Sequence, residues 1–424
     1  MAIRIYSVGG IHMKNIRLWI AAAVIMLALL CAGAASAEII ASGDCGAEGD
    51  NVTWTLDTEG VLSITGTGAM QDYSYNFNTS SPTTPWKNHL GEIKSLMISD
   101  GVTDISNYAF IGCAGLTSVV LSNNLTSIGD YAFRYCSNLT SIVIPDSVTS
   151  IGYSAFWECS SLMNIVLPDG MTCIGSFAFR NCSSLTSIVI PDGVTSIGYA
   201  VFAVCSNLTN IVIPDSVISI GYAAFNDCSS LMSIVIPDSV TSIGNYAFYG
   251  CNSLTSIVIP DSVTSIGEWA FGYCNNLTSI VIPNGATNLG SNAISNNTLI
   301  YCYANSSAEK WAKNNNRGDN IRYLTPEDVA IVHLPDELTE IHDEAYLNTA
   351  VEIVRLPESC TKIGARAFAN CTQLLRIEIP AMNIKIAEDA FANSPNVAIY
   401  APTDSAAQFY AEAHGIPYFT YPTE

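Results

Sequence analysis

Cysteine thiols recur in this sequence at a constant spacing, and they are the first side chains to consider for chemistry. Their sequence positions increase by 23 from each member to the next: Cys113, Cys136, Cys159, Cys182, Cys205, Cys228, Cys251 and Cys274. A thiol can form a disulfide, ligate a metal ion or act as a nucleophile. Each unit of 23 residues has one cysteine of this series, and no second cysteine recurs with it as a partner. The sequence also has no Cys-x-x-Cys pair. We call this series the cysteine column and interpret it as small buried apolar side chains, with disulfides and metal binding as the alternatives.

Aspartates form a second column, at Asp146, Asp169, Asp192, Asp215, Asp238 and Asp261. Two unit charges about 5 Å apart in water repel each other by roughly 0.8 kcal/mol, so this row costs free energy unless hydrogen bonds or cations offset the repulsion. Aspartate also favours turns, because its side chain bonds the nearby backbone. We interpret the column as turn residues, with a weak calcium ladder as the alternative.

Histidines and catalytic motifs complete the search for chemistry. The five histidines lie at His12, His89, His333, His342 and His414, without metal-ligand spacing. The sequence contains no G-x-S-x-G, phosphate-binding loop, G-x-G-x-x-G or H-E-x-x-H motif. It therefore predicts no catalytic residue, no metal site and no cofactor, and a protein that is not an enzyme.

The cysteine and aspartate columns belong to a repeated unit of constant length, such as residues 136–158. In this unit Leu139, Ile142 and Ile144 alternate with outward positions, which predicts a short strand with one buried face. Pro145 ends the strand, because proline cannot donate a hydrogen bond to a neighbouring strand.

The second half of each unit returns to the core and then turns. Val148 and Ile151 are apolar, and Gly152 permits a tight bend. Ala155 and Phe156 follow in a helical or 3-10 turn that is too short to be stable alone. No single unit can bury its apolar face, so neighbouring units must stack and share a continuous core. The sequence therefore predicts a repeat solenoid.

The repeat resembles the leucine-rich repeat superfamily, and most closely its BspA-like class. The resemblance rests on L-x-x-I-x-I-P at residues 139–145, V-x-x-I-G at 148–152 and A-F-x-x-C at 155–159, and it extends over roughly residues 93–400. It implies a right-handed superhelix, strand-rich α/β in class, with a parallel sheet on its concave side and short helical or 3-10 segments on its convex side. It also implies a secreted or cell-surface protein that binds other macromolecules, often in adhesion to host matrix or other cells.

Outward-facing residues of the predicted strands form the candidate binding surface. The central one is always valine: Val120, Val143, Val166, Val189, Val212, Val235, Val258 and Val281. A long exposed apolar row is typical of an interaction site. The alternative is that neighbouring valines only pack against each other and favour the strand. Because the row barely varies between units, it suits a periodic ligand, lateral self-association, or a spacer without a ligand.

Variable residues concentrate between the glycine and cysteine columns of the repeat. Many are aromatic, in the pairs Tyr153/Trp157, Phe177/Arg180, Tyr199/Val204, Tyr246/Tyr249 and Trp269/Tyr273. Aromatic side chains are enriched at protein interfaces, but they also serve to cover a core. Both interpretations stay open.

The N-terminus has the pattern of a secretory signal peptide. Lys14 and Arg17 precede an apolar run at residues 18–31, and Ala35-Ser36-Ala37 follows. Cleavage after Ala37 would leave an exported protein without a membrane span, and an uncleaved anchor is the alternative.

The charge balance excludes one class of partner. The chain has 37 acidic and 16 basic residues, and removal of residues 1–37 with their three bases takes the formal charge from −21 to −24. Such a surface repels nucleic acids and anionic lipids.

Composition and repeat regularity divide the chain into successive parts. Basic residues become more frequent after about residue 300, where the regular repeat also breaks. The predicted parts are a signal peptide at 1–37, an N-terminal β-hairpin cap at 38–92, a main leucine-rich repeat array at 93–300, a cap-like break at 301–325, a second short array at 326–395 and a C-terminal cap at 396–424. The alternative is one continuous solenoid with an insertion at 301–325.

Together, the residues and the resemblance predict a secreted or cell-surface protein that binds a protein or glycan partner, in host matrix or on another cell, with a role in adhesion. A passive structural spacer or a self-associating surface component is the alternative, and a secreted enzyme is the third hypothesis.

Overall fold

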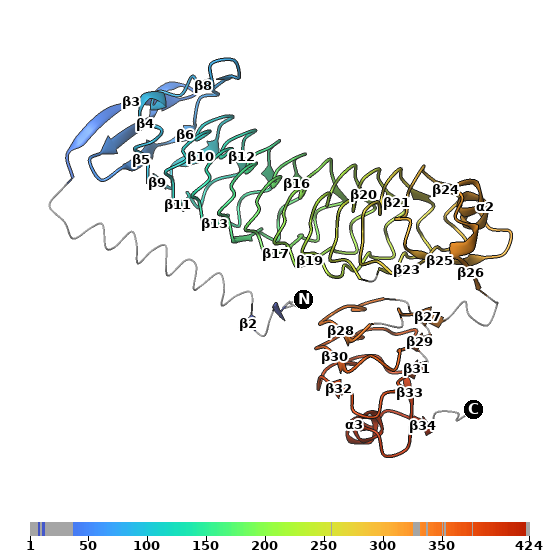
Figure 1. The fold of residues 1–424 in the computed structure, drawn as a ribbon. Helices are drawn as coiled ribbons and strands as arrows, with labels where there is room; N and C mark the ends of the chain where they lie inside the picture. The colour runs from blue at the N-terminus through green and yellow to red at the C-terminus, as the bar shows by residue number, and fades with distance from the viewer. Residues whose placement is uncertain are drawn as a thin grey trace. The chain divides into compact units, whose positions relative to one another are not determined.

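The computed structural model describes residues 7–8, 11–12, 37–255, 257–324, 331–335, 338–349, 351, 353–374 and 376–420. The predicted signal peptide lies outside the described residues, apart from Ala37 and two short antiparallel strands, β1 (Ser7–Val8) and β2 (Ile11–His12). The described chain forms two compact units, one ending at Ile211 and the other beginning at Val212. Figure 1 shows that both consist mainly of short strands repeated along the chain.

The first unit opens with an antiparallel sheet that covers the start of the repeats. Its strands are β3 (Ile39–Gly46), β4 (Gly49–Asp57) and β5 (Val61–Gly66), and the first repeat strand is β9 (Ser95–Ile98). Asp57 shapes the turn into β5, because its carboxylate accepts hydrogen bonds from the amides of Glu59 and Val61, at 3.0 and 2.9 Å. Strand β5 pairs in parallel with β9 and so takes the place of a preceding coil.

Short elements connect this antiparallel sheet to the repeats. They are β6 (Gly68–Ala69), the antiparallel pair β7 (Tyr75–Asn76) and β8 (Ser81–Pro82), and the 3-10 helix η1 (Lys87–His89). Just before η1, Trp86 is fully buried, and its ring stacks on Phe110 with 5.6 Å between centroids. The aromatic core of the repeats therefore begins inside the N-terminal segment.

Each coil of the first unit contributes one strand to each of two parallel series. The first series is β9, β11 (Ser118–Val120), β13 (Ser141–Val143), β15 (Asn164–Val166), β17 (Ser187–Val189) and β19 (Asn210–Val212). The second series is β10 (Val102–Ile105), β12 (Ser127–Ile128), β14 (Ser150–Ile151), β16 (Cys173–Ile174) and β18 (Ser196–Ile197). Neighbouring strands pair at the repeat spacing, as Ile142 with Ile165, so equivalent positions of successive coils lie side by side.

Turns close each coil where the sequence predicts helical or 3-10 segments. The amide of Arg134 donates to the carbonyl oxygen of Tyr131, and the amide of Cys136 donates to that of Phe133, at 3.2 and 3.1 Å. These are the i to i+3 bonds of a 3-10 helix. Tyr131 and Tyr135 have positive φ values of 58° and 67°, and each such residue interrupts the helical path after one turn.

The core of the first unit is a stack of phenylalanine rings, one from each coil. Phe110, Phe133, Phe156, Phe179 and Phe202 are all fully buried. Successive rings lie 5.3 to 5.7 Å apart between centroids. Each such pair adds about 0.5–1.5 kcal/mol beyond the burial of its area. The predicted solenoid, in which each coil covers the apolar side of the one before it, is therefore confirmed.

The second unit continues with the same kind of coil. Its regular strands are β20 (Ser219–Ile220), β21 (Ser242–Ile243), β22 (Ser265–Ile266), β23 (Ser279–Val281) and β24 (Asn288–Leu289). Next come β25 (Leu299–Tyr303), helix α2 (Ser307–Asn314), the 3-10 helix η2 (Gly318–Asn320) and β26 (Ile321–Leu324). Ser306 caps α2 by accepting a hydrogen bond from the amide of Glu309, and Trp311 of the helix is buried.

A shorter group of coils follows in the same unit. One sheet runs in the order β27 (Ile331–His333), β29 (Ile353–Arg355), β31 (Arg376–Glu378), β33 (Ala398–Ala401) and β34 (Tyr418–Thr420), and the other joins β28 (Glu340–Ile341), β30 (Lys362–Ile363) and β32 (Lys385–Ile386). Helix α3 (Ala406–His414) lies between β33 and β34 in the chain and is capped by Ser405. The strand, serine-capped helix and parallel strand at this end repeat the arrangement of β25, α2 and β26.

Of the helices that the structure describes, none has the length and hydrophobicity needed to cross a lipid bilayer.

Candidate binding surfaces

The cysteine column lies in the interior of the coils. Each thiol from Cys136 to Cys205 donates a hydrogen bond to a phenylalanine carbonyl oxygen of the preceding coil, at 3.1 to 3.3 Å. Burial raises the pKa of the Cys136 thiol well above its ordinary value and that of Cys113 to about 12. No disulfide joins the cysteines that the structure describes, and Cys173 alone among them is exposed. The interpretation of the column as buried side chains is confirmed, and these thiols are poor nucleophiles because they stay protonated.

The aspartate column lies at the turns after the first strands. Asp146, Asp192, Asp238 and Asp261 are all exposed. The pKa of Asp238 is raised, first by partial burial and then by the charges of Asp215 and Asp261. The repulsion expected along this row is therefore present in the second unit. Within the described ranges, no three His, Cys, Asp or Glu side chains converge in a way that could hold a metal ion.

The structure brings the predicted valines together as paired neighbours within each unit. In the first unit Val143 lies opposite Val166, and in the second Val258 pairs with both Val235 and Val281. The row also extends toward the N-terminus, because Val120 lies opposite Met97, which is 40% exposed. Val166 is buried, at 6% exposure, whereas Val120, Val143, Val189, Val212, Val235, Val258 and Val281 are half-buried. Each row is therefore a partly exposed apolar strip in which neighbours cover each other's flanks.

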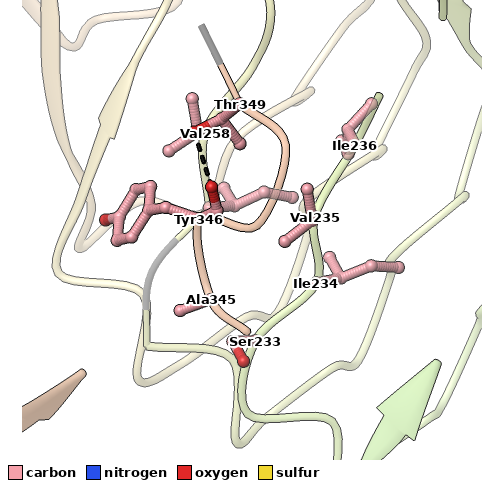
Figure 2. Close-up of a pocket in the computed structure, with 9 residues that line it drawn as sticks. Ser233, Ile234, Val235, Ile236, Val258, Ala345, Tyr346 and Thr349 are labelled. Carbon is pink, nitrogen blue, oxygen red and sulfur yellow. Dashed lines mark hydrogen bonds between the residues drawn. The ribbon is translucent and has the colours of Figure 1, made fainter. Parts of the chain in front are cut away.

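A small pocket in the second unit includes two of these valines. Figure 2 shows Val235 and Val258 at its wall, together with Thr349, whose hydroxyl donates a hydrogen bond of 2.8 Å to the carbonyl oxygen of Tyr346. The pocket has a volume of about 20 Å³. That volume holds about one water molecule, so the pocket is too small for an organic ligand.

A row of aromatic rings, which the sequence did not reveal as one feature, crosses the turns of the first unit. It consists of Tyr75, Tyr108, Tyr131, Tyr153, Phe177 and Tyr199, and we call it the aromatic row. Its successive centroids lie 6.4, 4.7, 5.2, 5.3 and 4.7 Å apart. After the N-terminal Tyr75, every coil supplies one ring, from either of two adjacent positions that follow the second strand. Rings from two different sequence columns thus meet in a single row.

Two arginines lie beside the aromatic row. The guanidinium carbon of Arg134 lies 3.8 Å from the ring centroid of Trp157 and 4.5 Å from that of Tyr135. Arg134 is buried, at 7% exposure, and it donates a hydrogen bond of 2.6 Å to the Tyr135 hydroxyl. Arg180 lies on Trp157 at 4.9 Å. Arg134 therefore interacts with the protein's own rings and presents little positive charge to solvent.

The second unit has an aromatic cluster at the equivalent turns. Tyr246 lies 5.5 Å from both Tyr222 and Tyr249, and Tyr249 lies 5.1 Å from Tyr273. Tyr222 and Tyr273 are exposed. Trp269 stacks beside Tyr273 at 6.0 Å. In both units, then, the variable positions of the repeat gather aromatic side chains at the surface.

The repeats match one family description along most of the described chain. The description reads "BspA type Leucine rich repeat region (6 copies)", and it matches residues 86–209, 195–321 and 327–413. A search of curated proteins gave no significant match.

Solved structures of bacterial proteins are similar to this chain, and that of one leucine-rich repeat protein shares its fold. A protein from Bacteroides ovatus is 24% identical, with 88% of this chain and 99% of that chain covered and a TM-score of 0.50. A leucine rich cell surface protein from Faecalibacterium prausnitzii is 24% identical over 85% of this chain and 95% of its own, with a TM-score of 0.36. The pneumococcal vaccine antigen PcpA is 16% identical over 91% and 99%, with a TM-score of 0.39. The coils of equal length, the phenylalanine stack and the match over three long segments lead to one conclusion: this chain belongs to the BspA-type leucine-rich repeat family.

Proposed function

We propose that this protein is exported and binds other macromolecules with the surface of its coils, as a secreted or cell-surface component that acts in adhesion. The observation that carries the proposal is the valine row. Val143 and Val166 are held opposite each other by the strand ladder, and an isolated bridge pairs Val235 with Val258. Apart from the buried Val166, such a strip offers a partly exposed apolar side chain in each coil in a fixed register, and exposed apolar strips mark interaction sites.

An extended partner suits this surface better than a small molecule. The pocket of Figure 2, which touches Val235 and Val258, has room for about one water molecule. A strip of single side chains from successive coils gains affinity by contact with many coils at once, as a protein or a long glycan provides. The protein is therefore proposed to be a binding protein and not an enzyme.

Charge reversal on the valine row tests the proposal. Val143→Glu combined with Val189→Glu places two carboxylates on the strip, and we expect at least about a tenfold loss of binding to immobilised matrix proteins and mucin glycans. The matched control is Thr149→Glu with Thr195→Glu, because both threonines are exposed and lie outside the valine row. Circular dichroism and thermal melting verify that each variant keeps the fold. Equal binding by the valine and threonine variants would contradict a role for this strip.

Lateral self-association is the second candidate function, and the sameness of the valine row favours it. A surface that repeats the same side chain in successive coils is complementary to a second copy of itself. Sedimentation velocity of the full chain over a range of concentrations distinguishes the two functions. Self-association predicts a concentration-dependent species that the two valine-to-glutamate changes abolish, whereas a monomer at all concentrations argues for a separate partner.

A further inference from the structure

Three rings of the aromatic row stand at positions where aromatic residues are unfavourable for the backbone. Tyr108, Tyr131 and Phe177 have φ values of 59°, 58° and 60°. Bulky side chains seldom adopt this left-handed conformation, which glycine and asparagine accept more easily. In the other two coils the same left-handed position, two residues before the core phenylalanine, holds Ser154 and Ala200. A turn therefore does not need an aromatic residue, and the row must be explained by what its side chains do.

From Tyr131 onward the rings of the row are oriented differently from those of the core, whereas the pairs before it stack with 6° and 8° between their planes. Core rings such as Phe156 and Phe179 stack nearly flat, with 6° between their planes. From Tyr131 onward, by contrast, the planes of Tyr131 and Tyr153 differ by 57°, those of Tyr153 and Phe177 by 70°, and those of Phe177 and Tyr199 by 51°. A tilted pair leaves part of a ring face uncovered, whereas a flat stack covers both faces.

Exposure alternates along the same stretch. Tyr153 is 36% exposed and Tyr199 is 44% exposed, while Tyr131 and Phe177 are half-buried. The two exposed rings are two coils apart, which is about 10 Å at the spacing of adjacent strands. That separation is close to the length of a disaccharide. The half-buried rings hold the exposed ones in place, since each lies within 5.3 Å of its neighbours.

We propose that the aromatic row of the first unit binds a neutral polysaccharide, whose pyranose rings lie on Tyr153 and Tyr199. An aromatic face attracts the polarised C–H groups on one side of a sugar ring, and alternate tyrosines match a chain of repeating units. Asp130 is exposed, and its Oδ1 accepts a hydrogen bond of 2.7 Å from the amide of Tyr153, so its carboxylate lies beside the row and can accept hydrogen bonds from sugar hydroxyls. The inference deepens the proposed function, because it names a ligand class for a second surface of the coils.

Charge and regularity favour a neutral polysaccharide over an anionic polysaccharide and over a protein partner. Anionic polysaccharides are disfavoured because the chain carries a formal charge of −21, Asp130 lies next to Tyr131 and Glu158 lies next to Trp157. Two arginines, Arg134 and Arg180, lie on the ring of Trp157 and so interact with the protein's own aromatic side chains. A protein epitope is irregular, whereas the row supplies one ring from every coil.

Affinity electrophoresis and calorimetry of the full chain test the proposal with defined polymers: β-glucan, xylan and mannan as neutral probes and polygalacturonate as the anionic probe. We expect binding to at least one neutral polymer. Tyr153→Ala with Tyr199→Ala should weaken it about tenfold, as expected for the loss of two ring contacts. Tyr153→Phe with Tyr199→Phe keeps the ring faces and should stay within about threefold. Phe409→Ala is the matched control, because Phe409 is 57% exposed but lies outside the row, on α3.

The outcomes separate this inference from the proposed function. Failure of all three neutral polymers to bind, preference for polygalacturonate, or unchanged affinity in the folded double-alanine variant would each overturn the aromatic row as a glycan site. If matrix-protein binding persists in that case and remains sensitive to Val143→Glu with Val189→Glu, the proposed function stands without it. Thermal melting of each variant verifies that lost binding is not lost folding.

Discussion

The thiol of Cys159 donates a hydrogen bond to the carbonyl oxygen of Phe133, 3.2 Å away and 26 residues earlier in the chain. The same oxygen accepts a bond of 3.1 Å from the amide of Cys136. Each of these cysteines therefore joins its own coil to the preceding one and satisfies a carbonyl that the stack has removed from water. The column is more than a set of small apolar side chains, and this accounts for a thiol at a position where alanine would also fit.

Removal of one of these thiols should be measurable as lost stability. We expect Cys159→Ala to lower the free energy of unfolding by about 1–2 kcal/mol, through a lost hydrogen bond and a small cavity. Cys173→Ala removes an exposed thiol and should change it by less than about 0.5 kcal/mol. Urea unfolding followed by circular dichroism gives both values. Equal shifts in the two variants would argue against a structural role for the column.

High pH should destabilise the coils through the same thiols. Burial raises the pKa of Cys113 from 9.0 to about 12, so between these values the folded thiol keeps a proton that the unfolded thiol has lost. The contribution of this thiol to folding stability is therefore fully present below pH 9 and is lost as pH rises toward 12. The free energy of unfolding falls by up to about 1.4 kcal/mol per pH unit for each such thiol. Urea midpoints at several pH values above 8 measure this slope. Cys113→Ala should make it shallower, and an unchanged slope would rule out this thiol as a cause.

The phenylalanine stack should be the most sensitive part of the core. Phe156 is fully buried between Phe133 and Phe179, with centroids 5.3 and 5.6 Å away. We expect Phe156→Ala to cost about 3–5 kcal/mol, since it leaves a cavity in the middle of the stack. Tyr153→Ala, in the same coil but 36% exposed, should cost much less. A thermal melt of both variants tests the difference, and similar melting temperatures would be inconsistent with the stack as the main core.

Close contact between neighbouring coils should make one glycine indispensable. A Cβ atom at Gly175 would lie 2.5 Å from the carbonyl carbon of Gly152, which is too close for two non-bonded carbons. Gly175→Ala must therefore push two coils apart, and we expect a loss of about 1–3 kcal/mol.

The control for this substitution lies in the preceding turn. A Cβ atom at Gly170 would lie 3.6 Å from the carbonyl oxygen of Asp146, an ordinary contact. Gly170→Ala should therefore be neutral or stabilise by less than about 1 kcal/mol. Denaturant midpoints of both variants check the pair, and tolerance of alanine at Gly175 would mean that the coils can separate without cost.

The sequence predicted the solenoid and its columns because every regular coil has the same length. When equivalent positions recur at a constant interval and strands pair at that offset, Phe156 must lie beside Phe133 and Phe179, and Cys159 beside Cys136 and Cys182. The pairing of Val143 with Val166 follows from the same register. These relationships need only the period and the alternation of apolar residues.

The tertiary structure decided which side chains are exposed and which of them meet, because the repeat period alone determines neither. It determined that the valine row is only partly exposed, because side-chain exposure depends on how neighbouring side chains cover each other. It also merged Tyr131 and Tyr153, which occupy different positions of the repeat, into one aromatic row with 5.2 Å between their rings. Long side chains from adjacent backbone positions can converge on the same place, and backbone spacing does not record that convergence. The solenoid could therefore be predicted from the sequence, whereas the aromatic row could be identified only from the positions of the side chains in the structure.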